Sequence, residues 1–339
     1  MTKLLALTNI HTEIGVRLAG RARAAGMRVR ALDALGVSSP LTKSLHVDVR
    51  RGSLHDRNAL ASFLRGVDVL VHSAGAPKEL RSWRELRTHH VDGTDCLASE
   101  ARKAGVRRMI HLSSLPTTGD IAEGRVDELG IARWGADAFQ QTSLEGERLA
   151  VRHHRPQELE VLVLRTSDIY GPAGVDWVLR PLDLMQRGLM TLPSGGGEVM
   201  NPVFVDNLCD AVFAGMRTGH TGQAFNITDD LTVPLDTYFG SLAAATDCRA
   251  PRRLPSPMHR MMQGALRKGA RLVGMRRQVA VLPSRIHGVR RGYTTRNARD
   301  LLRHRPRVQL ADGMEKTQRW LRSEGHLRAA DGFPFRRAM

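Results

Sequence analysis

The chain has 339 residues, of which 42% are hydrophobic and 25% are charged, a composition that excludes a disordered protein and allows one large domain or two lobes. Its formal net charge is +17, so its surface should attract anions. Only 4% of the residues are aromatic and no known nucleic-acid-binding motif accompanies the charge, so we expect no specific nucleic-acid partner.

Cysteine usage and hydropathy bear on the compartment. Cys96, Cys209 and Cys248 have no metal-ligand spacing and are typical of a reducing environment. The run LLAL near the N-terminus is too short for a secretory signal, and no stretch approaches the roughly 18 apolar residues of a membrane-spanning helix. We therefore expect a cytoplasmic protein without a metal site.

The first predicted elements form a βαβ unit. Residues 3–8 predict a strand, 13–25 carry the apolar period of a helix, and 27–33 predict a second strand. Strand, helix and strand with short links imply a parallel pair with a right-handed crossover.

The alternation of helices and strands continues to residue 165. Helices are predicted at 57–65, 82–104 and 137–153, and strands at 67–72, 107–113 and 159–165. Continuously apolar runs such as VDVLVH and LEVLVLR are typical of strands that are covered on both faces. The predicted fold class is α/β, with a Rossmann-like doubly wound parallel sheet.

The composition changes after Tyr170-Gly171-Pro172. The remaining chain combines a Gly- and Pro-rich segment, two helical patterns and a basic stretch, at 173–200, 235–248, 311–323 and 258–277. We assign 1–172 to a nucleotide-binding lobe. Residues 173–339 are assigned mostly to a smaller substrate-binding lobe, with some segments returning to the first lobe.

The turn after the first strand is where a dinucleotide diphosphate meets a helix N-terminus in such folds. Its sequence, TNIHTEIG, keeps Gly15 but has Asn9 and Thr12 where glycines would permit a tight turn and close phosphate approach. Asn tolerates a left-handed conformation, whereas β-branched Thr does so poorly. Glu13 adds a negative charge beside any diphosphate. Asp33, at the end of the second strand, is placed to hold a ribose hydroxyl and to favour NAD over NADP.

Motifs along nearly the whole chain carry a family resemblance. They include RGSLHD (51–56), VHSAG (71–75), LRTSDIYGPAG (164–174) and NPVFVDNLCDAV (201–212), in this order. The chain resembles the extended short-chain dehydrogenases/reductases of the NAD-dependent epimerase/dehydratase type, in particular the 3β-hydroxysteroid dehydrogenase-like branch. The resemblance implies the fold more strongly than any reaction, because one fold hosts many chemistries.

The resemblance also implies a dinucleotide site. Its residues in this chain are Asn9, Thr12, Gly15, Asp33, Ser53, Leu54, Ala74 and Thr166. Ser53 replaces an Asp near the adenine, and Thr166 replaces a Pro. With two motif glycines also replaced, we expect NAD to bind weakly or not at all.

The implied catalytic pair is absent from the sequence. Phe139 and Ser143 stand where the family has Tyr and Lys, and Glu147 anchors this alignment. A phenyl ring cannot exchange a proton, and a serine has no charge to lower the pKa of a neighbour. Ser114 falls on the family's catalytic Ser/Thr position.

Three further polar residues are candidates for a remaining site: Thr117, Tyr170 and His90. Thr117 follows the predicted strand that ends near Ser114. Tyr170 lacks an activating neighbour in the sequence, and packing at the lobe junction is its alternative role. His90 occupies the family's usual Asn position, and its alternative role is a structural hydrogen bond.

The basic stretch 258–277 places Met side chains on one helical face and Arg and Lys largely on the other. This pattern is typical of a helix on an anionic membrane, of a cover over an apolar pocket, or of an ordinary surface helix. A small-molecule ligand, peripheral membrane contact and a homodimer are therefore the partners that the sequence leaves open.

Three functions remain open from the sequence. The first is a small-molecule protein of specialised or lipid-like metabolism without hydride transfer, either a non-redox isomerase, cyclase or lyase or a ligand-binding pseudoenzyme. The second is an NAD-dependent oxidoreductase or epimerase with relocated acid/base residues. The third is a basic interaction protein on a membrane or nucleic acid.

Overall fold

The computed structural model describes residues 2–33, 40–73, 82–115, 125–129, 138–194, 196–272 and 292–327. The chain divides into two compact units. The first comprises Met1–Ile169, Asn201–Thr232 and Val289–Arg307, and the second comprises Tyr170–Met200, Val233–Gly288 and Val308–Met339. Two segments beyond residue 172 thus belong to the first unit.

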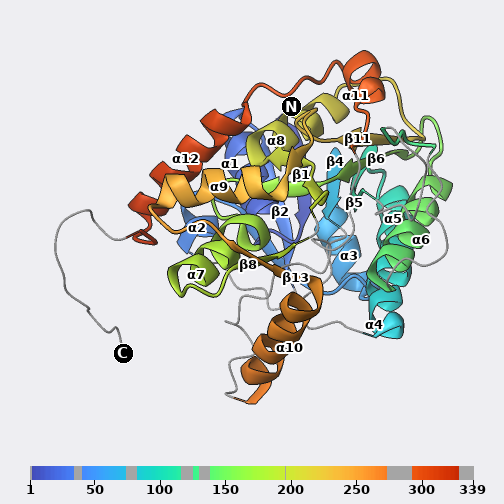
Figure 1. Ribbon diagram of the computed structural model, residues 1–339. Helices are drawn as coiled ribbons and strands as arrows, with labels where there is room; N and C mark the ends of the chain where they lie inside the picture. Colours follow the sequence, from blue (N-terminus) through green and yellow to red (C-terminus); the bar gives the residue numbers. More distant parts are fainter. Residues whose placement is uncertain are drawn as a thin grey trace. The chain divides into compact units, whose positions relative to one another are not determined.

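A seven-stranded parallel sheet forms the centre of the first unit (Figure 1). Its spatial order is β11-β6-β5-β4-β1-β2-β3. The strands are β1 Leu4–Thr8, β2 Arg28–Asp33, β3 Asp48–Arg51, β4 Val69–Ser73, β5 Arg108–Ser114, β6 Glu160–Thr166 and β11 Ala224–Ile227. All neighbouring pairs are parallel, which confirms the predicted doubly wound α/β fold.

Helices cover both faces of this sheet. On one face lie α1 (Glu13–Ala24) and α8 (Val205–Gly215), and on the other lie α3 (Arg57–Leu64), α5 (Gly93–Lys103) and α6 (Ala138–Arg152). Short helices α2 (Pro40–Ser44) and α11 (Arg296–Leu301) belong to the same unit. Because both faces are covered, every residue of β1 is buried, as its apolar sequence predicts.

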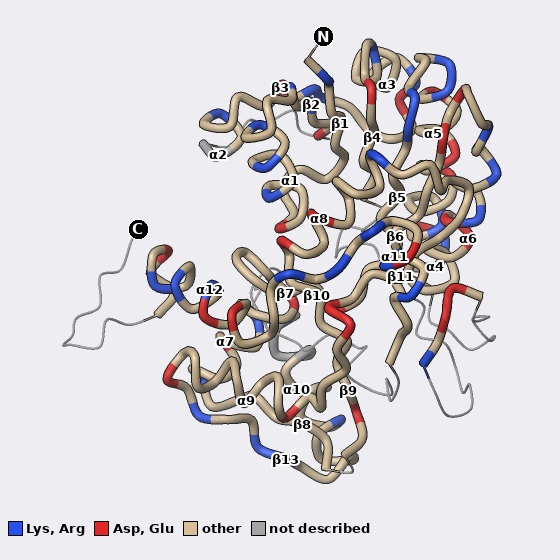
Figure 2. The backbone as a smooth tube through the Cα atoms, turned by 90° about the horizontal axis from the view of Figure 1, so that it is seen from above, with Lys and Arg blue, Asp and Glu red and all other residues tan. Residues whose placement is uncertain are grey.

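Opposite charges line the contact between α1 and α8. Arg17 donates to Asp206 over 2.8 Å, and Arg21 pairs with Asp210. Figure 2 shows the basic positions of α1 opposite the acidic positions of α8. These pairs are partly exposed, so they orient the helices more than they stabilise them.

The predicted helix 82–104 is helical throughout but is not one regular α-helix. It consists of α4 (Trp83–Arg87), the π-helical turn η1 (Thr88–Asp92) and α5. A π-turn inserts an extra residue into the helix, and such turns are frequent at functional sites. His90 lies in this turn.

The second unit is built from short elements around an aromatic core. Its elements are η2 Val175–Leu179, α7 Arg180–Gln186, β8 Thr191–Ser194, β9 Val199–Met200, β12 Val233–Pro234, α9 Leu235–Thr246, β13 Arg252–Pro255, α10 Ser256–Leu272 and α12 Leu310–Ser323. The Tyr238 hydroxyl donates to the Trp177 carbonyl over 2.8 Å, and the Trp177 and Phe239 rings stack at 6.2 Å. Two further short strands, β7 (Asp168–Tyr170) and β10 (Pro202–Phe204), pair with one another.

The described residues form neither a membrane-spanning helix nor a metal-binding cluster. None of their helices combines the length and the apolarity that crossing a bilayer requires. No group of three His, Cys, Asp or Glu side chains in these ranges is placed to hold a metal ion.

Gly15 provides a test of how α1 packs against the turn after β1. A Cβ at Gly15 would lie 2.5 Å from the Asn9 carbonyl oxygen and 2.9 Å from the Ile10 Cα, both rigid backbone atoms. We expect Gly15→Ala to lower the free energy of unfolding by about 1–3 kcal/mol, as overpacking does. Urea titration followed by circular dichroism measures this change.

Gly20→Ala is the matched control in the same helix. Its added Cβ would meet only a Leu45 methyl carbon at 3.8 Å, so we expect unchanged or slightly higher stability. Equal effects of the two substitutions would show that α1 does not rest on the turn as described.

Candidate functional site

The turn between β1 and α1 has Asn9 and Thr12 at the two positions where the resemblance implies glycines. Asn9 takes up the left-handed conformation, with φ of 55°. Thr12 has φ of −82° and is the N-cap of α1; its hydroxyl accepts from the Gly15 N–H over 3.1 Å and donates to the Asn9 carbonyl over 2.9 Å. The expected strain at Thr12 was wrong, because capping needs an extended conformation that Thr readily adopts.

Asn9 also joins the carboxyl ends of two strands. Its side-chain amide donates to the Ser73 carbonyl at the end of β4 over 2.7 Å. The strand order reverses between β1 and β4, and ligands of doubly wound sheets bind outside the strand ends at such a reversal. Asn9 therefore lies at the expected ligand crevice.

Asp33 ends β2, as the sequence predicts, and faces a side chain from the turn. The His11 Nε2 lies 3.2 Å from an Asp33 carboxylate oxygen, and His11 is about half exposed. A ribose hydroxyl would therefore share Asp33 with an imidazole. Glu13 is the first residue of α1, where a carboxylate suits the helix dipole but repels a diphosphate.

The other predicted cofactor residues occupy separate places in the first unit. The Ser53 hydroxyl accepts from the His55 N–H over 3.1 Å, in the loop before α3. Leu54 packs closely on Gly93: a Cβ added to Gly93 would lie 3.1 Å from a methyl carbon of Leu54. Thr166 ends β6, buried and in register with Ser114. Ala74 lies outside the described residues.

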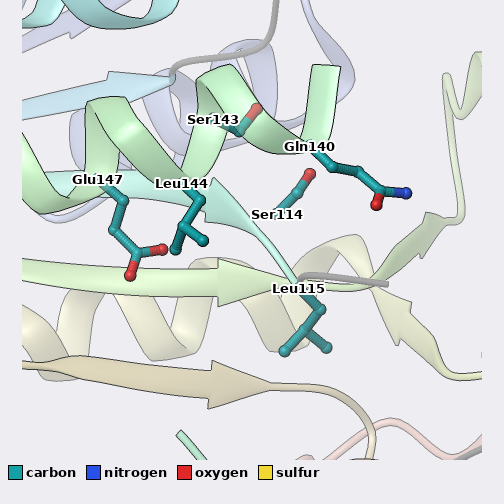
Figure 3. A pocket seen from close by; sticks show the side chains of 6 residues that line it. All are labelled: Ser114, Leu115, Gln140, Ser143, Leu144 and Glu147. Carbon is teal, nitrogen blue, oxygen red and sulfur yellow. The ribbon is translucent and has the colours of Figure 1, made fainter. Parts of the chain in front are cut away.

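A pocket opens where β5 ends beside α6. It holds about 230 Å³, part of it open to solvent, and is lined by Ser114, Leu115, Gln140, Ser143, Leu144 and Glu147. Figure 3 shows the Ser114 hydroxyl pointing toward α6, which carries Gln140 and Ser143. Two predicted site residues, Ser114 and Ser143, are thus brought together with an amide and two leucines.

His90 lies against the same face of α6. Its Nδ1 is 2.7 Å from the Thr142 hydroxyl and 3.5 Å from the Ser143 hydroxyl. Its ring meets Phe139 edge to face at 5.0 Å, and only 1% of the residue is exposed. An added Cβ on Gly146 would lie 2.2 Å from the His90 carbonyl oxygen, so the backbones of η1 and α6 nearly touch.

A buried ion pair holds α6 to the sheet. Arg165 of β6 donates to both carboxylate oxygens of Glu147 at 3.0 Å and, through a second nitrogen, at 2.6 Å. A third nitrogen of Arg165 donates to the Glu128 carbonyl over 2.8 Å. Glu147 lines the pocket, but its charge is engaged by Arg165, so it serves as an anchor rather than as a free base.

Two buried histidines face one another on the neighbouring strands β4 and β5. His72 bridges Thr8 and Thr94, with ring nitrogens 3.0 and 3.1 Å from the two hydroxyls. Its ring is 5.2 Å from that of His111, which is fully buried. Burial lowers the pKa of His72 well below its usual value, and burial lowers that of His111 to about 4 against the opposing charge of Glu147.

Tyr170 is not among the residues that line the pocket beside α6. Tyr170 belongs to the second unit, where it is fully buried and packs on Tyr238 at 5.9 Å. An added Cβ on Gly313 of α12 would lie 2.3 Å from its hydroxyl oxygen. This close packing favours a core role for Tyr170. Thr117 lies outside the described residues.

Comparison with known proteins identifies the family. The model of the NAD dependent epimerase/dehydratase family matches residues 11–228. The chain belongs to this family. The match confirms the predicted extended short-chain dehydrogenase/reductase, and relatives whose names refer to sterols or 3β-hydroxysteroids support the 3β-hydroxysteroid dehydrogenase-like branch.

Two curated relatives and one solved structure illustrate the similarity. The decarboxylating sterol-4-alpha-carboxylate 3-dehydrogenase of Bos taurus is 25% identical over 82% of this chain and 81% of its own. Sterol demethylase protein B of Methylococcus capsulatus is 30% identical over 68% of this chain and 70% of its own. The structure of MoeE5 in complex with UDP-glucose and NAD has a TM-score of 0.75 and 23% identity, over 94% of this chain and 99% of that one, which supports the fold.

Some site residues of this family member escaped the sequence reasoning. Gln140 was not singled out, because a Gln on a helix carries no chemical signature. The partnership of Arg165 with Glu147 was missed as well, although Arg165 directly follows the apolar run VLVL of β6. A charge in such a place requires a buried partner, and that signal was available.

The buried histidines predict a pH dependence of stability. The folded pKa of His111, about 4, lies below its ordinary value of 6.5, so the unfolded chain takes up the proton first as the pH falls. The stabilisation is complete above about pH 6.5 and is lost toward pH 4. We expect His111 alone to lower the free energy of unfolding by about 2 kcal/mol between pH 7.5 and pH 5. Urea unfolding at these two pH values measures the difference.

Replacing the titrating group isolates its contribution. Neither ring nitrogen of His111 has a hydrogen-bond partner within the described ranges, so Leu can take its place. We expect His111→Leu to flatten the pH dependence by about 2 kcal/mol and the exposed control His220→Leu to leave it unchanged. An unaltered slope in His111→Leu would contradict the assignment.

Proposed function

We propose that the protein binds NAD on its first unit and binds a small, lipid-like molecule beside α6, without the hydride transfer that a Tyr/Lys pair supports. The observation that carries the proposal is the environment of positions 139 and 143. Phe139 packs against His90, and Ser143 lies 3.5 Å from the His90 ring nitrogen. No phenol or ammonium group stands at either position of α6 to relay a proton.

The pocket beside α6 suits a molecule with an oxygen on an apolar skeleton. Ser114, Ser143 and Gln140 supply hydrogen-bonding groups, while Leu115 and Leu144 supply apolar walls. Donors arranged around one oxygen can stabilise a developing negative charge by roughly 3–4 kcal/mol. The site therefore suits either a non-redox rearrangement or ligand binding, and the sterol-named relatives point to an alicyclic ligand.

The turn after β1 fits a dinucleotide in conformation. Asn9 adopts the left-handed backbone that a glycine would supply, Thr12 caps α1, and Gly15 allows the close contact between turn and helix. The N–H groups of the first turn of α1 would hold the diphosphate, and Asp33 would hold a ribose hydroxyl. NAD supplies hydride chemistry when bound; here we assign to the chain only its binding and orientation. This proposal replaces the expectation of weak or absent binding.

Binding measurements on two carboxylates test the NAD site. We expect Asp33→Asn to weaken NAD binding about ten-fold, because a charged hydrogen-bond acceptor is lost. Glu13→Gln should strengthen it by about two- to five-fold, because a negative charge leaves the diphosphate side of the helix. Calorimetric titration with NAD and NADP measures both effects.

The two variants serve as controls for one another, because general damage to the turn would lower affinity in both. The unaltered protein should bind NADP more weakly than NAD, since Asp33 repels a 2′-phosphate. Equal or tighter binding of NADP would overturn the assignment of Asp33.

Restoring the missing pair tests the proposed chemistry. With NAD and a panel of 3-hydroxysteroids and nucleotide sugars, the unaltered protein should show no NADH absorbance above background. The double variant Phe139→Tyr, Ser143→Lys should show a measurable rate, because it supplies the proton donor and the group that lowers its pKa. Adding Ser114→Ala to the double variant should abolish that rate, since Ser114 would hold the substrate oxygen.

A second candidate function is an NAD-dependent oxidoreductase that uses His90. It is favoured by the short contacts of His90 with Thr142 and Ser143, beside the pocket. Under this alternative the unaltered protein turns over a member of the panel, and His90→Gln removes the activity. That result would replace the first proposal.

A further inference from the structure

The first half of helix α10 in the second unit exposes two methionines and buries two polar side chains. Met258 is 49% exposed and Met261 is 70% exposed, whereas the polar His259 and Gln263 are 0% and 5% exposed. Helices of globular proteins normally bury their apolar side. The opposite arrangement leaves two large thioether side chains in solvent at one side of the helix.

The orientation of α10 is set by its buried polar side. The His259 Nδ1 lies 3.0 Å from the Thr191 hydroxyl of β8. The chain passes directly from β13, which pairs with β8, into the first turn of α10 (Figure 1). Neither amide atom of Gln263 has a hydrogen-bond partner in the described part of the chain. Burial of such polar groups is costly, so the burial of apolar residues alone does not explain how the helix is oriented.

The charge around α10 has one sign. The sequence contains no Asp or Glu between Asp247 and Asp300. The helix itself carries Arg260, Arg267, Lys268 and Arg271, and Arg260 is exposed. The segment between Asp247 and Asp300 therefore carries only positive charge. A partner of complementary charge is anionic.

We propose that α10 lies on an anionic lipid surface, with Met258 and Met261 in the interface and Arg260 at the headgroups. Basic helices with one apolar side bind membranes in this way. A nucleic acid would match the charge but would leave the methionines in water. A second copy of this chain would bring two acid-free segments together, and their like charges would repel.

Sedimentation with lipid vesicles tests the proposal on the full chain. At 0.1 M NaCl, the bound fraction should be at least about ten-fold larger on vesicles with 30% phosphatidylglycerol than on pure phosphatidylcholine, since each basic side chain at the surface contributes about five-fold. Raising NaCl to 0.5 M should remove most of this difference, because added salt screens the charges.

Variants of the exposed residues identify the surface. We expect Met258→Asp with Met261→Asp to lower binding at least about ten-fold, and Arg260→Ser to lower it about five-fold. The control is Trp83→Asp in the first unit, which removes an apolar side chain that is 48% exposed and should leave binding unchanged. All four residues are exposed, so the thermal midpoint of each variant should stay within a few degrees of the parent.

Several results would overturn the proposal. One is vesicle binding that the methionine double variant retains or that does not depend on lipid charge. Another is a concentration-dependent dimer, seen by sedimentation velocity without lipid, that the double variant abolishes. A third is a short DNA duplex that binds the parent and the double variant equally while the vesicles bind neither.

Discussion

The hydrogen bonds between the carboxyl ends of β1 and β4 are the constraint on which the first unit depends. The Thr8 hydroxyl accepts from the Ser73 N–H, the Asn9 amide donates to the Ser73 carbonyl, and His72 continues the network to Thr94. From this junction the sheet extends in two opposite directions, and the connections on either side leave in different directions. Asn9 thus does more than occupy the turn, because its side chain links the carboxyl ends of β1 and β4.

A buried ion pair and a glycine fix the position of α6. Arg165 and Glu147 hold the helix against β6, and Gly146 allows the helix to touch the backbone of η1. These contacts fix where positions 139 and 143 lie, whatever side chains they carry. The position of α6 depends on the Arg165–Glu147 pair and on Gly146. The reactivity of the site depends instead on the side chains at positions 139 and 143, so the two properties can change independently.

Sequence reasoning located β1, β2, β4, β5 and β6, most of which carry a buried apolar run. It missed β3, whose sequence DVRR is charged, and the four-residue β11, because neither has an apolar run long enough to stand out. The strand predicted at 107–113 is β5 at Arg108–Ser114, and the helix predicted at 137–153 is α6 at Ala138–Arg152. The π-turn around His90 was not predictable, since an inserted residue leaves the apolar period almost unchanged. The conformation of Thr12 was predicted wrongly because its motif position was assumed to require glycine. Its local hydrogen bonds instead make Thr12 the N-cap of α1.

The exposure of Met258 and Met261 also makes α10 sensitive to oxidants. Peroxide converts a thioether to a sulfoxide, which is polar and is reversed only by dedicated reductases. Oxidation of these two side chains would remove the apolar character of the outward side while the buried contact of His259 with Thr191 stays intact. The fold would be unchanged. If α10 lies on lipid as proposed, the fraction of the protein bound to the membrane would fall as Met258 and Met261 are oxidised.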